Sequence, residues 1–170
     1  VGTLQNNGSE LVGDISSVVA GTGLSGGGTS GAVTLNSDLL AKQAGTNFTN
    51  SLLVGTSSTG TLNDANSNTG VGIGVFGALT TGDNNVAVGL NALDVNTTGC
   101  FNTALGASTL LVNQTGICNV AIGASALRCN TASNNIAVGV QPLYYNTSGT
   151  NNTAIGTKAL FCNTTADNNT

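Results

Sequence analysis

Residues 68–170 repeat a short motif at an almost constant period, and this period restricts the possible folds more than any local preference. Each row ends on a glycine that follows an asparagine, a variable residue, a small residue and an aliphatic one, as in NVAVG and NTAIG. Subtracting the positions of successive glycines gives spacings of 17, 17, 17, 16 and 17. Self-similarity at a short fixed period is typical of a solenoid, in which each repeat forms one layer of a stack. The anchor glycines of the six rows are Gly72, Gly89, Gly106, Gly123, Gly139 and Gly156.

The columns within the rows predict an all-β fold. Residues 86–88 and their equivalents are short and β-prone, and alanine lies two positions before the glycine in five of six rows, with Gly70 in the first. We expect a parallel β-roll or β-solenoid of about six 17-residue rows, each with two strands of about four or five residues and two turns. The small column indicates a tight interior. A large apolar residue four positions after each glycine forms the apolar core column: Phe76, Leu93, Leu110, Leu127, Leu143 and Leu160.

Two asparagine columns accompany the glycine column, and we expect both to be structural ladders. Stacked asparagine side chains hydrogen-bond along a column and satisfy turn backbone groups. One ladder lies four positions before the glycines and consists of Asn85, Asn102, Asn119, Asn135 and Asn152. The other lies seven positions after them and consists of Asn96, Asn113, Asn130, Asn146 and Asn163. The single shorter row is expected to lose its residue in the NTASNN turn, where length changes cost least.

Residues 1–67 do not follow the repeat and are expected to form a glycine-rich shaft or connector segment with short β-strands. Val18–Val19 and residues 33–35 are candidate strands, and residues 26–28 are a candidate loop with positive φ. Residues 37–43 suit either a capped helical turn through Gln43 or a strand that includes Leu39 and Leu40, and the sequence does not separate the two. Residues 57–68 are loop-like, so the domain boundary is placed there, with the repeat β-roll domain at 68–170.

Composition excludes several classes of function. Only Lys42, Arg128 and Lys158 are basic and the net charge is −4, so no basic patch is available for nucleic acid. No run of about 18 apolar residues occurs, so membrane insertion is not expected. The four cysteines form no CxxC pair and the chain has no histidine, so neither a metal site nor a cofactor is expected. Cys129 and Cys162 share a column two rows apart, about 9.6 Å, which is too far for a disulfide within one chain.

The small number of apolar side chains per row predicts self-association. Each row offers about four, mostly small, and a thin single coil hardly balances the entropy of ordering a whole row. Parallel copies of the chain around a common axis would supply the missing burial. A threefold axis buries one face of each chain without leaving an open flat face, so we expect a homotrimer.

The row motif and the glycine-rich segment resemble sequences of known fibre proteins. Rows of the form NTAxGxxALxxNTTGxx resemble repeats of bacteriophage and other viral tail-fibre proteins, and they are similar in logic to the head repeats of trimeric autotransporter adhesins of the YadA type. The segment AGTGLSGGGTSGAVTLN resembles stretches of phage fibre shafts. The resemblance implies a trimeric, left-handed parallel β-roll that works in surface attachment, and it supplies no catalytic residues. The adhesin repeat is shorter and richer in serine, and no segment resembles an autotransporter membrane anchor, which favours the viral fibre.

The expected function is therefore that of a structural segment of a trimeric virion fibre, located at the virion surface, which projects and positions host-receptor binding. A bacterial adhesin head at the cell surface is the alternative. Expected partners are copies of the chain itself, other virion or fibre subunits, and a cell-surface glycan or protein receptor. Glycan contacts would come from turn residues such as Asp94, Tyr144 and Tyr145, although a plain packing role also suits the tyrosines.

Three further activities are less consistent with the sequence than the fibre. A fibre-borne polysaccharide depolymerase would need paired carboxylates, but Asp83 and Asp94 fall in different columns, so no enzymatic activity is expected. Ice binding would need an unbroken threonine ladder, which Gln114 and Ala132 interrupt. A calcium-binding β-roll would need a GGxGxD repeat, which is absent. Finally, N-x-S/T triplets at Asn96, Asn113, Asn146 and Asn163 are glycosylation acceptors only on a eukaryotic secretory route.

Overall fold

The computed structural model describes residues 49–55 and 60–170 in full, together with the backbone of the strand segments between residues 5 and 48. Every regular element in this part of the chain is a β-strand, as the sequence predicts. The chain divides into two compact units, Val1–Leu40 and Ala41–Thr170. No helix in the described residues is long and apolar enough to cross a membrane.

The first unit contains short antiparallel strands. β1 (Gln5–Asn6) pairs with β2 (Ser9–Glu10), and β4 (Leu24–Gly28) pairs with β3 (Val18–Val19) and β5 (Leu35–Ser37). The strand predicted at Val18–Val19 is confirmed. The loop predicted at residues 26–28 is wrong: Gly27 and Gly28 pair with β3 and Gly26 with β5, so partners on two sides hold these glycines extended. Residues 33 and 34 of the other predicted strand lie outside the described residues.

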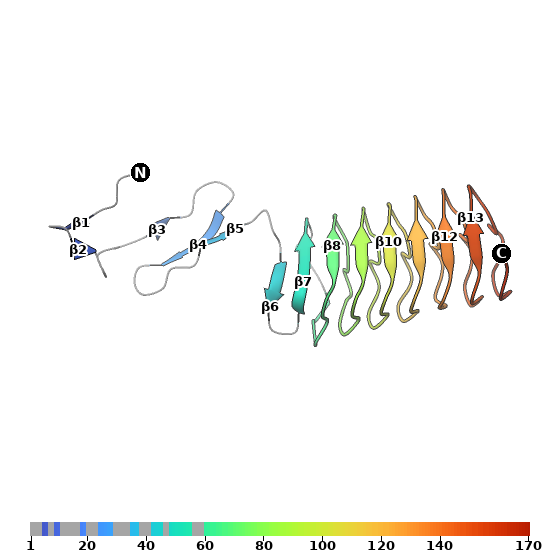
Figure 1. Ribbon diagram of the computed structural model, residues 1–170, viewed down its shortest axis with the longest axis horizontal. Helices are drawn as coiled ribbons and strands as arrows, with labels where there is room; N and C mark the ends of the chain where they lie inside the picture. Colours follow the sequence, from blue (N-terminus) through green and yellow to red (C-terminus); the bar gives the residue numbers. More distant parts are fainter. Residues whose placement is uncertain are drawn as a thin grey trace. The chain divides into compact units, whose positions relative to one another are not determined.

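The second unit is a β-solenoid of about six turns, which confirms the predicted fold class. Its sheet begins with β6 (Lys42–Gly45), which pairs antiparallel with β7 (Phe48–Val54), and continues through parallel strands from β7 to β13 in chain order (Figure 1). The predicted helical turn over residues 37–43 is wrong for its last residues, because Lys42 and Gln43 belong to β6. The alternative, a strand that includes Leu39 and Leu40, lies outside the described residues. The remaining strands are β8 Thr69–Val71, β9 Val86–Val88, β10 Thr103–Leu105, β11 Val120–Ile122, β12 Ile136–Val138 and β13 Thr153–Ile155.

Successive strands stack in register, one row per strand. Ala104 pairs with Ala87 on one side and with Ala121 on the other, and the same alignment holds along the sheet. The middle residue of each three-residue strand is buried, and its two neighbours point outward. The alanine column therefore lines the interior, where it packs against the apolar core column. Five residues of that column are fully buried, and Leu160 is half-buried.

The second strand predicted in each row is absent from the described rows, and this prediction is wrong. After the anchor glycine the chain turns, with positive φ at alternate residues, as at Gly106 (132°), Ser108 (57°) and Leu110 (49°). Left-handed residues at alternate positions turn the backbone away from an extended conformation, and each non-glycine residue in that conformation costs about 1–2 kcal/mol. Full burial of the leucine side chain returns about 1.5–3 kcal/mol. Burial of the core leucine therefore offsets the cost of its own left-handed backbone, and the chain turns here instead of forming a second strand.

The folded array contains one more row than the six recognised in the sequence. β7 pairs in parallel with β8, placing Leu53 opposite Gly70 and Val54 opposite Val71. Gly55 follows with a φ of 88° and precedes Gly72 by one full period of the repeat, so it occupies the anchor position of this row. The loop-like residues from Gly60 to Asn68 are the turn of that row. Leu53 stands where later rows have alanine, and this large residue conceals the motif.

The first two rows compensate for that large residue. A methyl group on Gly70 would meet the Leu53 side chain and would lie 2.8 Å from Cγ1 of Val75 and 3.0 Å from Cδ2 of Phe76. Leu53 and Phe76 are both bulkier than the alanine and leucine of later rows. Glycine at position 70 therefore makes room for them in the core.

This packing gives a first testable prediction. Gly70→Ala is expected to destabilise the fold by about 1–3 kcal/mol through overpacking, and Leu53→Ala by about 2–5 kcal/mol through a cavity. The double variant restores the pairing of alanine with alanine found in later rows. Its loss of stability should therefore be clearly smaller than the sum of the losses of the two single variants. A double-mutant cycle by chemical denaturation measures this coupling. Additive losses of stability would show that Leu53 and a methyl group at position 70 do not compete for the same space.

Candidate functional site

The anchor glycines hold the rows together by close backbone contact. All six have φ between 109° and 137°. A methyl group on Gly106 would lie 2.8 Å from the carbonyl carbon of Gly123 in the next row, and Gly72, Gly89, Gly123 and Gly139 meet the next row in the same way. At Gly156 no atom lies within 4 Å of that position. The glycine column is thus required both by its backbone conformation and by the close approach of the next row.

The asparagines four positions before the anchors form a buried ladder, here called the inner ladder, which begins one row earlier than expected, at Asn68. The side chains of Asn85, Asn102, Asn119 and Asn152 bond the rows on both sides. Oδ1 of Asn102 accepts hydrogen bonds from the backbone N–H (3.0 Å) and from Nδ2 (3.1 Å) of Asn119, and its own Nδ2 donates to Oδ1 of Asn85 at 3.2 Å. The same Nδ2 also donates to the Gly116 carbonyl at 2.9 Å. Asn68, Asn85, Asn102, Asn119, Asn135 and Asn152 are all fully buried.

The asparagines seven positions after the anchors form a second ladder, here called the turn ladder. It converges with the inner ladder on shared carbonyl groups. The Gly116 carbonyl accepts from Asn102 and also from Nδ2 of Asn113 (3.0 Å), and the Gly149 carbonyl accepts from Asn135 and Asn146 (2.8 Å each). Asn96, Asn113, Asn130 and Asn146 are fully buried, and Asn163 is half-buried. These contacts place both ladders in the interior of the turns, where they hold backbone groups rather than a ligand.

The 16-residue row interrupts the turn ladder. Nδ2 of Asn130 donates to the Ala132 carbonyl two residues on, whereas Asn113 reaches the Gly116 carbonyl three residues on. The missing residue therefore lies between Asn130 and Ala132, which confirms the NTASNN turn as the site of the deletion. Oδ1 of Asn113 is left as a buried acceptor without a partner among the described residues. The shortened turn thus removes one bond of the ladder.

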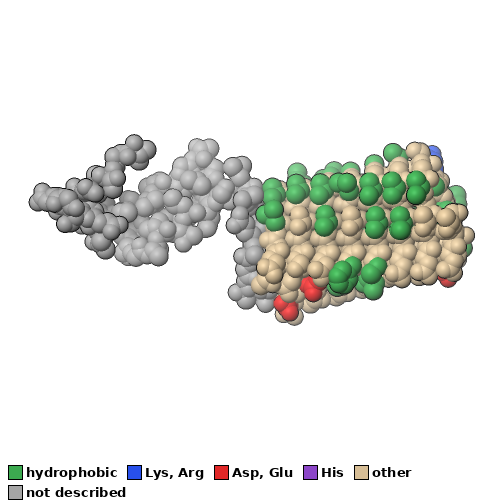
Figure 2. Space-filling view, viewed as in Figure 1, with side chains coloured by type: hydrophobic (Ala, Val, Ile, Leu, Met, Phe, Trp, Pro, Cys, Tyr) green, Lys and Arg blue, Asp and Glu red, His purple; other side chains and the backbone are tan. Residues whose placement is uncertain are grey.

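The outward side of the parallel sheet carries a continuous apolar column, here called the sheet-face ladder. It contains the residue before each anchor glycine, and Figure 2 shows it as an uninterrupted green row along the array. Leu105 is 46% exposed and Ile155 is 72% exposed. The residues two positions earlier form a parallel column that includes Val86, Val120 and Ile136, and neither column contains a charged residue. The members of the ladder are Val54, Val71, Val88, Leu105, Ile122, Val138 and Ile155.

The sheet-face ladder follows from the strand geometry. Because each strand has one inward residue between two outward ones, the aliphatic position next to the glycine must face away from the core. The apolar column is visible in the sequence, but its exposure is not. An exposed apolar surface that extends along several elements is typical of a site of protein association.

The two tyrosines belong to an aromatic cluster in the last rows. The rings of Tyr144 and Phe161 are stacked with centroids 5.4 Å apart, and Tyr145 lies edge-on to both, at 4.7 and 5.1 Å. Arg128 lies over Tyr144 at 5.6 Å and Lys158 over Phe161 at 5.5 Å. Tyr144 is half-buried and Tyr145 is 47% exposed. The rings chiefly cover one another, which favours the packing role over sugar stacking on Tyr144.

The carboxylates of the array act as hydrogen-bond acceptors between rows. Oδ1 of Asp83 accepts from the Asn66 N–H, and Oδ1 of Asp167 accepts from the backbone N–H (2.6 Å) and hydroxyl (2.9 Å) of Thr150. These two bonds from Thr150, the backbone bond first, hold the pKa of the Asp167 carboxyl below its usual range. Asp83 and Asp167 share a column but lie several rows apart, and Asp94 lies in another column. Asp64 lies near Asp83, because Nδ2 of Asn66 donates to Oδ1 of Asp64 at 2.7 Å while the Asn66 N–H donates to Asp83.

The threonine column after the turn ladder uses its hydroxyl hydrogens within the array. Thr80 and Thr97 each donate at 3.0 Å to a carbonyl of the next row, and Thr131 and Thr147 donate at 2.8 and 2.9 Å. The next column outward is exposed, but the 16-residue row interrupts it. An unbroken lattice of free hydroxyl groups, which ice binding would need, is not formed by these columns.

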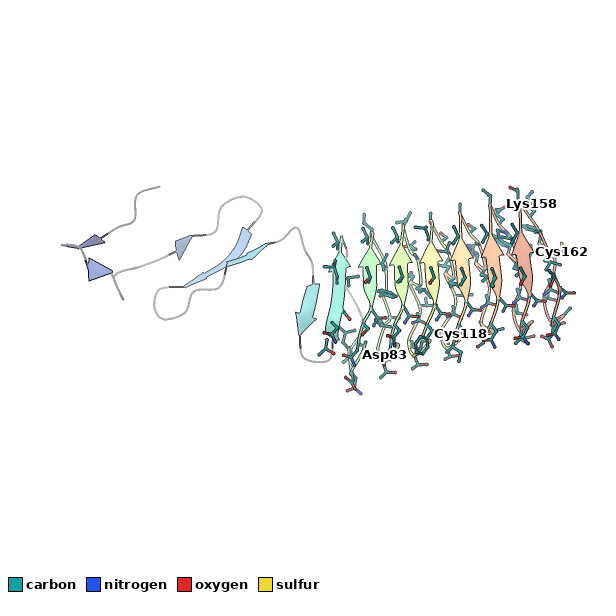
Figure 3. All side chains as sticks on the ribbon, viewed as in Figure 1. Asp83, Cys118, Lys158 and Cys162 are labelled. Carbon is teal, nitrogen blue, oxygen red and sulfur yellow. The ribbon has the colours of Figure 1, made fainter. Side chains whose placement is uncertain are left out.

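The four cysteines are free thiols. Sγ of Cys100 accepts a hydrogen bond from the Asp83 N–H in the preceding row at 3.3 Å. In the same way, the Asp83 carboxylate accepts a hydrogen bond from the Asn66 N–H of the row before it. Figure 3 shows Asp83 and Cys118 on the same side of the array, and Lys158 and Cys162 at its C-terminal end. Among the described residues, no three His, Cys, Asp or Glu side chains are grouped to hold a metal ion.

Comparison of the chain with known protein families, with curated proteins and with solved structures found no match. The fold and the ladders therefore define the class of protein by themselves. The chain contains a parallel β-solenoid of 17-residue rows, held by buried asparagine ladders and by an anchor glycine in each row.

Proposed function

We propose that the array is a structural segment of a homotrimeric virion fibre, which associates through the sheet-face ladder and projects a receptor-binding part from the virion surface. The observation that supports association is the ladder itself, seven apolar residues in line on an uncharged face. Seven strands at about 4.8 Å give a rod of roughly 30 Å. The resemblance of the rows to tail-fibre repeats supports the placement in a virion, and the hydrogen bonds that Asp83 and Asp167 accept from neighbouring rows support a structural role for these carboxylates.

We favour a threefold arrangement because it buries one face of every chain without leaving an open flat face. Three copies around an axis turn each sheet inward and bury the ladder of every chain in one shared core. The polar turns then face outward, where host-surface receptors and other fibre subunits are the expected partners.

The test is the molar mass of the full chain in solution. Light scattering is expected to give about three times the 16.6 kDa of one chain. Leu105→Glu combined with Ile155→Glu places two charges on the ladder and should reduce the mass to that of the monomer. The matched control is Phe101→Glu, because Phe101 is 60% exposed but lies outside the ladder, and this variant should keep the trimer mass. A monomeric or dimeric wild-type chain would overturn the proposal.

A further inference from the structure

The array contains six N-x-S/T triplets, and the structure separates them by accessibility. In a secreted protein this triplet is the acceptor for an N-linked glycan and marks a surface loop. The acceptor atom is Nδ2 of the asparagine, so its surroundings decide whether a glycan fits the folded chain. The six asparagines are Asn96, Asn113, Asn146, Asn151, Asn163 and Asn168.

Three of these acceptors are interior members of the turn ladder. Asn96, Asn113 and Asn146 have no exposed surface. Nδ2 of Asn146 donates to Oδ1 of Asn130 at 2.7 Å and to the Gly149 carbonyl at 2.8 Å, so both of its hydrogens are in use. A sugar on this atom would replace one of those hydrogens and would need space that the packed turn does not have. The glycan would therefore remove a buried hydrogen bond as well as clash with the turn.

Two other acceptors lie on the surface. Asn151 is exposed, and its Nδ2 makes one long contact, 3.4 Å to Oγ1 of Thr150 in the preceding residue. Asn168 is exposed in the equivalent position of the next row. Asn163 is intermediate, because it is half-buried and donates to Oδ1 of Asn146 at 2.8 Å. A glycan on Asn151 would extend into solvent without disturbing either ladder.

We propose that N-glycosylation at Asn96, Asn113 or Asn146 and folding of the array exclude each other, so that the chain folds in a compartment without N-linked glycosylation. Glycans are attached to N-x-S/T triplets while the chain is still extended, before burial can protect them. On a secretory route the chain would therefore be modified first and would then fail to stack its rows. Asn151 is the triplet that a glycan can occupy in the folded array. The proposal holds whether or not the chain is trimeric.

The chain offers a matched variant that removes the triplets and keeps the asparagines. The third residues of the buried triplets, Thr98, Thr115 and Ser148, are exposed, and their side chains make no hydrogen bond within the described part of the chain. Thr165 has the same place in the triplet of Asn163. Changing these four to Val, Val, Ala and Val leaves the turn ladder intact. The triplets at Asn151 and Asn168, and those at Asn7 and Asn47 outside the described side chains, remain as internal controls.

The experiment expresses the full chain with a secretion signal in eukaryotic cells and, for comparison, in the bacterial cytosol. The bacterial wild type and the quadruple variant are expected to be soluble, protease-resistant and equally stable. The secreted wild type is expected to be retained or aggregated, with glycans mapped by mass spectrometry to Asn96, Asn113 or Asn146. The quadruple variant should be secreted in folded form with a glycan at Asn151.

Two outcomes would overturn the proposal. One is folded, secreted wild-type protein: with a glycan on a buried asparagine it contradicts the exclusion, and without such a glycan it contradicts modification of the chain before folding. The other is a quadruple variant that folds in bacteria but is still retained on the secretory route. If the variant fails to fold in bacteria, the wild type is secreted from cells in which N-glycosylation is inhibited. Rescue of folding then supports the proposal, and continued retention contradicts it.

Discussion

Gly106→Ala is expected to destabilise the array by about 2–6 kcal/mol, enough to unfold a protein of ordinary stability. Gly106 has a φ of 132°, a conformation that costs a residue with a side chain about 1–3 kcal/mol. The added methyl group would also lie 2.8 Å from the carbonyl carbon of Gly123, and overpacking of this kind costs about another 1–3 kcal/mol. The neighbour is backbone in the next row, so the clash can be relieved only by separating the rows.

Gly156 is a matched control for the close contact between rows. Gly156 has a similar φ of 120°, but no atom lies within 4 Å of its missing side chain. Gly156→Ala should therefore lose only the conformational term, about 1–3 kcal/mol. Urea unfolding of the two variants measures the difference, which isolates the contact between rows. Equal losses at both positions would mean that backbone conformation alone selects glycine in this column.

The fold could be predicted from the sequence because the period and the columns carry the same information. A repeat of nearly constant length with alanine before an aliphatic residue and glycine is consistent only with rows stacked in register, and the structure stacks Ala87, Ala104 and Ala121 in this way. The second strand was predicted wrongly because apolar periodicity cannot reveal backbone conformation. Leu110 is as apolar as a strand residue, but its φ of 49° is stabilised by burial in the assembled core.

Size compensation explains why the earliest row escaped recognition. Leu53 occupies the alanine column, so its row does not match the motif when read alone, and Gly70 in the next row makes space for it. The separation of Gly55 from Gly72 by one full period is the sequence signal that identifies this row. The sequence also does not show which side chains are exposed. Only the structure shows that the sheet-face ladder from Val54 to Ile155 lies on the surface and that the glycan-acceptor asparagine Asn146 lies in the interior of a turn.

Asn102→Asp is expected to make the stability of the array strongly dependent on pH, with a loss of about 3–5 kcal/mol at neutral pH. The substitution is isosteric and keeps Oδ1, which accepts from Asn119. It replaces the donor Nδ2 by an oxygen that faces the Gly116 carbonyl, 2.9 Å from the original nitrogen, and Oδ1 of Asn85. Three acceptors then meet in a fully buried site, which raises the pKa of the new carboxyl.

The sign of the dependence follows from linkage. A carboxyl whose folded-state pKa is raised binds more protons in the folded than in the unfolded state, so stability falls as pH rises above the unfolded pKa of about 3.9, by up to about 1.4 kcal/mol per unit. The natural carboxyl of Asp167 has the opposite sign, because its pKa is lowered and its contribution disappears on acidification. Below pH 4 the protonated variant can donate to Gly116 again and should approach wild-type stability.

Chemical denaturation between pH 3 and pH 8 tests this prediction against Asn151→Asp, which introduces the same charge on the exposed column. The control should track the wild type across the range because its carboxyl remains in water. A flat profile for Asn102→Asp would mean that water or a cation reaches the inner ladder, and the ladder would then be an accessible polar channel. A profile that falls with pH would show that the asparagine amides stabilise the rows because they are uncharged and supply a donor to the preceding row and an acceptor to the next.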